Sequence, residues 1–191
     1  MNYGFFALMF RMKHIDRWAL MRCNAKENLA EHSLEVAIIA NALANIGNTY
    51  FNKNYSSDRI ALKALFHDAT EIMTGDLPTP IKYYNSDIRN AYATVEKCAQ
   101  DKVLSLLPQE LIEKYEDAFI LDEDEKILIK AADKLCAYIK CANEVRSGNI
   151  EFSHAAKTTK SAIEAFDCQE LKYFCKHFLE AFFEPLDNIS L

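Results

Sequence analysis

Apolar residues recur at intervals of three and four along nearly the whole chain, and this spacing constrains the fold more than any other feature. Side chains spaced in this way lie on one face of an α-helix, whereas a half-buried strand requires alternation. The segment boundaries resemble helix caps. Asn28 precedes one apolar run, and Glu31 follows it in the capping-box position. The sequence therefore predicts an all-α protein built as a compact helical bundle.

The composition favours helices over strands in the same way. The 191 residues include four glycines and four prolines, and valine occurs only at positions 36, 95, 103 and 145. Strand-forming residues and turn residues are therefore scarce. Half of the chain is hydrophobic, and this length suffices for one core but is marginal for two. We predict a single domain over residues 1–191.

Helix start and stop signals divide the chain into segments, with residues 15–28 irregular. We expect helices over about residues 3–14, 29–45, 57–75, 86–106, 108–117, 122–147, 150–166 and 169–183. Gly47, Gly75 and Gly148 are the expected stops of three of them.

Charge and hydropathy exclude several classes of protein. The net charge of -6 argues against binding a nucleic-acid polymer, because contact with its phosphate backbone relies on clustered Lys and Arg. The apolar run YGFFALMF near the N-terminus is short, has no basic segment before it, and is followed by Arg11 and Lys13. It resembles neither a signal peptide nor a membrane span. We expect a soluble, cytoplasmic protein that binds no membrane.

Ionisable residues interrupt the apolar faces of three separate helices. His32 shares a face with Val36 and Ile39, and Asp133 lies among apolar residues at the same spacing. The third interruption is the adjacent pair His67 and Asp68 in an apolar segment. Taken singly, each has an ordinary explanation: a hydrogen-bonded core histidine, or an aspartate that caps a helix or pairs with a lysine. It is improbable that separate explanations of this kind hold for all four residues at once.

A divalent metal ion accounts for all four residues at once. Its charge offsets the two carboxylates, and neutral imidazoles supply nitrogen donors, so no buried group lacks a partner. Mixed nitrogen and oxygen ligands are better suited to manganese, cobalt, iron or nickel than to zinc of the kind bound in thiolate-rich sites. The six cysteines show no Cys-x-x-Cys spacing. A six-coordinate ion would keep two positions open for substrate or water.

The order H…HD…D in a helical chain resembles the HD-domain metal-dependent phosphohydrolases. The segments RWALMR, ENLAEHSLEVA, FHDATEIMTGDLPTPIKYYN and KAADKLCAYIKC resemble, more closely, the bacterial HD-domain 5′-deoxynucleotidases of the YfbR type. The resemblance covers almost the whole chain and weakens after about residue 150. It implies an HD-domain fold, a homodimer and one divalent metal ion, such as Co²⁺ or Mn²⁺, per chain. It also implies a deoxyribonucleoside 5′-monophosphate substrate.

The resemblance assigns a role to each matching residue. The metal ligands would be His32, His67, Asp68 and Asp133, of which His32, Asp68 and Asp133 would also border the substrate. Arg17 would grip the phosphate, and Trp18 would lie against the sugar and disfavour a 2′-hydroxyl. The loop with Asp76, Leu77, Pro78 and Thr79 would form a substrate wall without reading the base.

Two carboxylates are candidates for proton transfer. Glu71, one turn beyond His67, is the candidate for orienting or deprotonating a water molecule, although it could instead only fix His67. Asp76 follows the Gly75 turn and is the candidate acid for the leaving 5′-oxygen, although an aspartate there could simply form the turn.

Two other functions stay open. HD domains also hydrolyse nucleoside triphosphates, cyclic dinucleotides and guanosine tetraphosphate, but the sequence shows no basic pocket for extra phosphates. Alternatively, the chain is a non-catalytic helical module that uses its metal for structure, or a nucleotide sensor. Arg17, Glu71 and Asp76 argue against this alternative, because a structural metal site is closed and needs no acid, base or anion clamp.

Overall fold

The computed structural model describes residues 2–77, 81 and 84–189, and within these residues the chain forms helices and no strand. The α-helices are α1 (Phe5–Met9), α2 (Leu29–Tyr50), α3 (Ser57–Phe66), α4 (Glu71–Thr74), α6 (Ser86–Leu104), α7 (Gln109–Glu116), α8 (Glu123–Arg146), α9 (Ser153–Glu164) and α10 (Gln169–His177). Short 3₁₀ turns cover Met12–His14, Asp117–Phe119, Ile150–Phe152, Leu179–Phe183 and Leu186–Asn188. The all-α prediction is confirmed.

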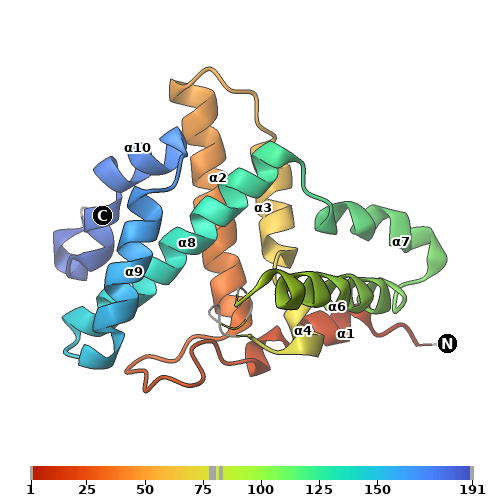
Figure 1. Cartoon of the computed structure of the whole chain (residues 1–191). Helices are drawn as coiled ribbons and strands as arrows, with labels where there is room; N and C mark the ends of the chain where they lie inside the picture. Colours follow the sequence, from red (N-terminus) through yellow and green to blue (C-terminus); the bar gives the residue numbers. More distant parts are fainter. Residues whose placement is uncertain (1, 78–80, 82–83, 190–191) are drawn as a thin grey trace.

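The long helices α2 and α8 cross at the centre of the molecule, and α3 lies alongside α2 (Figure 1). Helices α9 and α10 lie on one side of this centre, and α1, α6 and α7 lie on the other (Figure 1). The main core fills the space between α2, α3, α8 and the two C-terminal helices, with Leu43, Ile60, Leu135 and Leu171 fully or almost fully buried. Helices α2 and α8, which carry His32 and Asp133, therefore pack against each other and against α3, whose end directly precedes His67 and Asp68.

Two reciprocal caps fix where the central helices begin. The side chain of Asn28 accepts hydrogen bonds from the amides of Ala30 and Glu31, and the Glu31 carboxylate accepts the Asn28 amide. The start of α8 has the same arrangement, built from Asp122 and Glu125. Each cap satisfies amides that a helix start leaves without partners. These two expected starts are confirmed.

Several expected boundaries are wrong, among them that of the segment 169–183, in which α10 ends at His177 and a separate 3₁₀ turn follows. The segment 3–14 is not one helix, because α1 ends at Met9 and a separate 3₁₀ turn follows. Gly47 does not stop α2, which continues to Tyr50. Gly47 instead lies in the buried part of α2, where its missing side chain makes room for the ring of Tyr55. The segment 57–75 is also interrupted, between Phe66 and Glu71.

A second, smaller core lies between α1, α6 and α7. It contains Phe5, Val103, Leu104 and Leu107, with Phe66 of α3 packed against it. The ring of Phe66 lies 6.3 Å from that of Phe5, between ring centroids. This core therefore anchors the end of α3, directly before His67.

No helix in the described part of the chain is both long enough and apolar enough to cross a membrane.

We predict that Gly47→Ala destabilises the protein, although alanine in place of glycine ordinarily favours a helix by about 1 kcal/mol. A methyl group at this position would lie 2.5 Å and 2.9 Å from two ring carbons of Tyr55. Overpacking of this kind costs about 1–3 kcal/mol, so the free energy of unfolding in urea should fall. The control is Thr49→Ala on the exposed side of the same helix, which should change it by less than about 0.5 kcal/mol. A more stable Gly47→Ala variant would contradict the prediction.

Candidate active site

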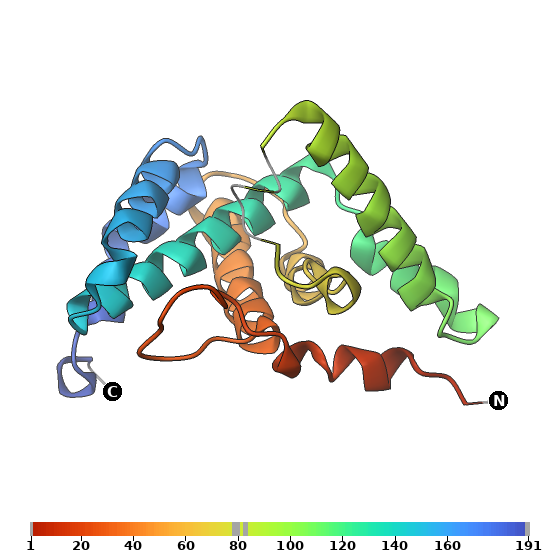
Figure 2. The ribbon, with the colours of Figure 1, turned by 60° about the horizontal axis from the view of Figure 1, so that its bottom comes forward.

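The candidate site lies where three central elements meet the loop of residues 15–28. His32 is in the first turn of α2, Asp133 is on α8, and His67 and Asp68 lie between α3 and α4. The loop runs past the end of the molecule where α2 begins (Figures 1 and 2). It is closed at its base by an antiparallel bridge between Asp16 and Asn28. Residues far apart in the sequence therefore surround one point.

His67 and Asp68 lie at a break between two helices and not in the middle of one, contrary to the expected helix over 57–75. The Nδ1 of His67 is 2.7 Å from the carbonyl oxygen of Ala64, which in an unbroken α-helix would accept the amide of Asp68. The backbone then continues with tighter bonds, from the amide of Ala69 to Phe66 and from that of Glu71 to Asp68. A side chain that competes for a helix carbonyl favours such a break.

The contact with Ala64 also sets the tautomer of His67. A carbonyl oxygen only accepts hydrogen bonds, so Nδ1 must carry the hydrogen. This leaves Nε2 to face the site, where it lies 3.1 Å from Oδ2 of Asp68. Metal-binding histidines are commonly oriented in this way, by a hydrogen bond from the nitrogen that does not bind the metal.

The four predicted ligands approach one another closely. Nε2 of His32 lies 3.2 Å from Oδ1 of Asp133 and 3.7 Å from Oδ2 of Asp68. Ligand atoms of His32, His67 and Asp68 lie within 4.8 Å of one another. Asp133 stands slightly apart from this group of three, through its contact with His32. Atoms that bind one ion at about 2.1 Å lie roughly 3–4 Å apart, so the measured contacts fit a shared ion.

The burial of the two histidines supports the same conclusion. The side chain of His32 is fully buried, and neither of its ring nitrogens has a well-formed hydrogen bond within the described part of the chain. The same is true of Nε2 of His67. A buried polar atom without a partner is costly, and a metal ion would serve both Nε2 atoms. These residues therefore could hold a metal ion.

Charged groups in the site shift the pKa values of their neighbours. Burial by itself lowers the pKa of His67, but the neighbouring Asp68 carboxylate outweighs it and raises this pKa to about 9. Burial has the opposite effect on Asp68, yet His67, followed by His32 and Arg17, holds the pKa of Asp68 well below its usual range. The pKa of Asp133 is also lowered, by His32, against the effect of burial. Both carboxylates are therefore ionised at neutral pH.

Arg17 lies beside these carboxylates. Its Nη1 is 3.5 Å from Oδ2 of Asp68, and its side chain is only 12% exposed. Burial lowers the pKa of Arg17, but Glu27, Asp68, Asp133 and Asp76 more than compensate and raise it. Arg17 therefore stays charged, and its guanidinium group lies at the edge of the candidate metal centre.

Trp18 has a left-handed backbone conformation, with φ of 57°, which is uncommon for a bulky residue. Its ring packs at 5.5 Å from that of Phe152. The indole Nε1 is buried and makes no hydrogen bond with the described residues. Both properties single out Trp18 as a residue held in place at some energetic cost.

The remaining predicted residues lie around α4. Glu71 is the first residue of α4 and is buried. Asp76 and Leu77 follow Gly75, whose φ of 74° ends that helix, and both are partly buried. The charge of Asp76 contributes to the raised pKa of Arg17. Pro78 and Thr79 lie outside the described residues.

Glu27 belongs to the site but was not predicted from the sequence. This carboxylate is buried, and its Oε1 lies 2.9 Å from Nε of Arg17 and 3.5 Å from Nδ1 of His32. Its position five residues before His32, in an irregular segment, carries no periodic signal. Only its place directly before the helix cap at Asn28 could have indicated from the sequence that Glu27 lies near His32.

Solved structures of known proteins identify the fold. A crystal structure of an HD-domain phosphohydrolase from Listeria innocua superposes with a TM-score of 0.82 at 23% identity, over 95% of this chain and 90% of that one. A cyanophage S-2L HD phosphohydrolase, solved with dA and one catalytic Zn²⁺ ion, gives a TM-score of 0.63 at 19% identity, over 92% and 96% of the two chains. The chain thus has the fold of the HD-domain phosphohydrolases.

The family follows from sequence relatives. The 5′-deoxynucleotidase YfbR of Escherichia coli (strain K12) is 47% identical over 189 residues, covering 97% of this chain and 95% of that protein. A 5′-deoxynucleotidase of Photobacterium profundum is 46% identical, over 97% of both chains. The model of the 5′-deoxynucleotidase YfbR-like family matches residues 4–182. This chain belongs to the YfbR-like 5′-deoxynucleotidase family, as the resemblance of its motifs predicted.

We predict that metal affinity rises with pH, because a bound ion must displace a proton from Nε2 of His67. The pKa of about 9 means that His67 is protonated at neutral pH in the absence of an ion. Between pH 6 and 8 the apparent affinity for Co²⁺ should therefore increase by up to about tenfold per pH unit. Competition against a chelator of known affinity measures it. An affinity that is constant over this range would show that His67 loses no proton to the ion.

Proposed function

We propose that this chain hydrolyses 2′-deoxyribonucleoside 5′-monophosphates to deoxynucleoside and phosphate, accepts all bases and disfavours ribonucleotides. The full-length relationship to 5′-deoxynucleotidases carries this proposal. The grouping of His32, His67 and Asp68 around one point supports it, because it provides the ligands that a metal-dependent phosphohydrolase needs.

His32, His67, Asp68 and Asp133 would hold one divalent ion, for which Co²⁺ and Mn²⁺ are our candidates on the basis of the nitrogen and oxygen donors. When bound, the ion supplies positive charge to the phosphoryl oxygens and activates the attacking water. The roles of the four residues as ligands rest on the distances above and on the resemblance. Three of the four, His32, Asp68 and Asp133, would also border the substrate.

Arg17 binds the phosphate in this proposal. Its guanidinium group is charged, is held beside Asp68, and can donate two parallel hydrogen bonds to an oxyanion. Its ion pair with Glu27 uses Nε, which leaves the terminal nitrogens to donate to the substrate. Arg17 would thereby orient the phosphoryl group and stabilise the charge that develops on it.

Glu71 and Asp76 would move the protons. Glu71, buried at the start of α4, orients or deprotonates the attacking water. Asp76 protonates the departing 5′-oxygen, which would otherwise leave as an unstable alkoxide. Asp76 follows the turn at Gly75, beyond the end of α4, and its negative charge contributes to the raised pKa of Arg17. Leu77, with Pro78 and Thr79, would form the wall along the nucleoside.

The homodimer and the cytoplasmic location rest on the resemblance and the sequence alone, and the single-domain organisation rests on the length of the chain. All three stay predictions.

A substrate and metal screen tests the proposal. The protein is treated with a chelator, reloaded with Co²⁺, Mn²⁺, Zn²⁺ or Mg²⁺, and offered deoxyribonucleoside mono-, di- and triphosphates and ribonucleoside monophosphates. Released phosphate is the readout. We expect turnover of the deoxymonophosphates, with similar rates for different bases. Preference for a triphosphate would favour a different HD-domain hydrolase, and no turnover with any ion would favour a non-catalytic module.

In the same assay, Asp68→Ala should reduce turnover at least about a thousandfold, because the metal contributes several kcal/mol and each 1.36 kcal/mol is a factor of ten. The control is Asp101→Ala, which removes an exposed carboxylate whose only ion pair among the described residues is with Lys97 and should keep the rate of the unmodified protein. Full activity of a folded Asp68→Ala variant would refute the assignment of this residue.

We predict that Trp18→Ala narrows the preference for dAMP over AMP. A ring held against the sugar leaves little room for a 2′-hydroxyl, and a contact of this size is worth about tenfold or more in kcat/KM. Trp18→Phe keeps a flat ring and should retain most of the discrimination. Paired rates on dAMP and AMP measure the ratio, and an unchanged ratio in Trp18→Ala would remove this residue from the sugar site.

A further inference from the structure

Glu27 occupies a position that the proposed mechanism does not use. It lies in the loop of residues 15–28, opposite Arg17, and the amide of Arg17 donates a 2.9 Å hydrogen bond to the Glu27 carbonyl oxygen. The backbones of the two residues are therefore held together directly beside the bridge at the base of the loop. Their side chains point into the protein, with exposed fractions of 12% for Arg17 and 9% for Glu27.

One oxygen of Glu27 reaches both halves of the candidate site. Oε1 accepts a hydrogen bond of 2.9 Å from Nε of Arg17. The same atom lies 3.5 Å from Nδ1 of His32, on the opposite side of the imidazole from the contacts of Nε2 with Asp68 and Asp133. Glu27 thus contacts the proposed phosphate-binding residue and a proposed metal ligand at once.

We propose that Glu27 is a positioning residue that couples the metal ligand His32 to the phosphate-binding Arg17. This inference rests on the proposed function. A carboxylate at Nδ1 favours the tautomer with its hydrogen on that nitrogen, which directs the lone pair of Nε2 toward the ion. The hydrogen bond to Nε fixes the plane of the guanidinium group, so Arg17 loses less conformational freedom when it binds a phosphate.

The loop that carries Glu27 is itself tied to α8. The carboxylate of Glu144 accepts the amides of Asn24 and Ala25, and it also accepts Nδ2 of Asn149 and Nζ of Lys140. Although burial raises the pKa of Glu144, these donors lower it to about 2. Glu144 therefore remains ionised and keeps the loop attached to the helix that carries Asp133. This anchoring explains how a loop residue can position groups in the site.

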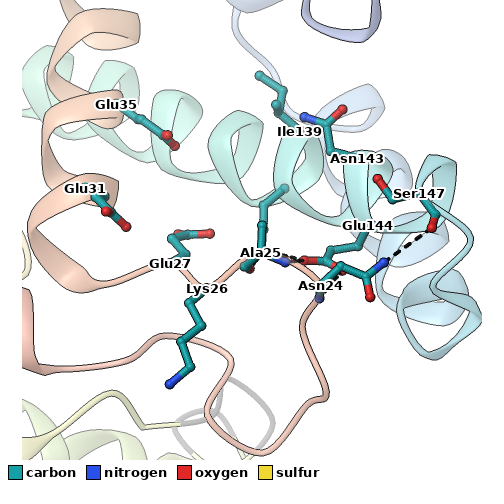
Figure 3. A pocket seen from close by; sticks show the side chains of 11 residues that line it. Asn24, Ala25, Lys26, Glu27, Glu31, Glu35, Ile139, Asn143, Glu144 and Ser147 are labelled. Carbon is teal, nitrogen blue, oxygen red and sulfur yellow. Dashed lines mark hydrogen bonds and ion pairs between the residues drawn. The ribbon is translucent and has the colours of Figure 1, made fainter.

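A cavity of about 460 Å³ lies on the other side of Glu27. Figure 3 shows Glu27 at its wall, with Glu31 and Glu35 of α2 pointing into the same space and Glu144 on the side of α8. Among the described residues, Glu35 makes no hydrogen bond or ion pair with Arg17 or His32, and it is exposed. Glu35 is therefore a matched control: a carboxylate in the same cavity without the two contacts.

The experiment compares Glu27→Gln with Glu35→Gln. The Kd for Co²⁺ is measured through the visible absorption of the bound ion, and kcat and KM are measured on dAMP at saturating Co²⁺. Glu27→Gln removes the negative charge beside Nδ1 of His32, and mutation of the group that orients a metal-binding histidine typically weakens metal binding about 10–100-fold. We expect this weakening, together with a raised KM, in Glu27→Gln and neither in Glu35→Gln. An unchanged Kd and KM in a folded Glu27→Gln variant would overturn the inference.

A double-mutant comparison separates the two contacts of Glu27. If Glu27 acts on the phosphate through Arg17, KM should be the same in Arg17→Ala and in Arg17→Ala with Glu27→Gln, whereas the Kd for Co²⁺ should still be weakened by Glu27→Gln. Independent, additive effects on KM would overturn the coupling. Should Glu27→Gln fail to fold, Glu27→Asp keeps the charge but shortens the reach, and an unchanged Kd and KM in this variant would overturn the inference.

The metal-binding measurement also distinguishes failure of this inference from failure of the proposed function. Absence of phosphate release by the unmodified protein would reject the deoxynucleotidase proposal. The Kd for Co²⁺ would still report on the contact between Glu27 and His32, and a weaker Kd in Glu27→Gln would support that contact.

Discussion

The hydrogen bond between His67 and the carbonyl oxygen of Ala64 is the interaction on which the candidate site depends. It lies at the C-terminal end of α3 and sets the tautomer of the imidazole. With α3 ended there, Asp68 lies at a helix break, close to both histidines and to Arg17. Phe66, the residue directly before His67, packs against the smaller core and anchors this end of α3. A single backbone carbonyl thus links the geometry of the helix to the chemistry of the side chains.

Electrostatics explains why the groups around this break can coexist in a buried position. Asp68, Asp133 and Glu27 are drawn together with one guanidinium group and two imidazoles. Without an ion, His67 holds a proton and partly balances the carboxylates, as its raised pKa shows. A divalent ion would replace that proton with a larger positive charge. In the proposed metal site, binding of a divalent ion would therefore be coupled to the loss of a proton from His67.

The sequence predicted the features that follow from local patterns. Helical periodicity indicated the all-α fold, and the cap at Asn28 was predicted because its side chain lies next to the amides from which it accepts hydrogen bonds. The apolar-face positions of His32, His67 and Asp133 indicated that they converge, although their roles as metal ligands stay predictions. Features that depend on distant contacts were not predicted. Gly47 resembles a helix stop in the sequence, but its role in the structure is to make room for the ring of Tyr55. Glu27 reaches the site only because the loop of residues 15–28 is closed by the bridge between Asp16 and Asn28.

The left-handed backbone of Trp18 has a consequence for the evolution of this loop. A bulky residue in that conformation gives up about 1–3 kcal/mol, and glycine would adopt the same φ without strain. Glycine would, however, lose the packing of the ring against Phe152. The indole therefore persists because its ring contacts outweigh the cost of the backbone, and this holds the backbone fixed directly beside Arg17.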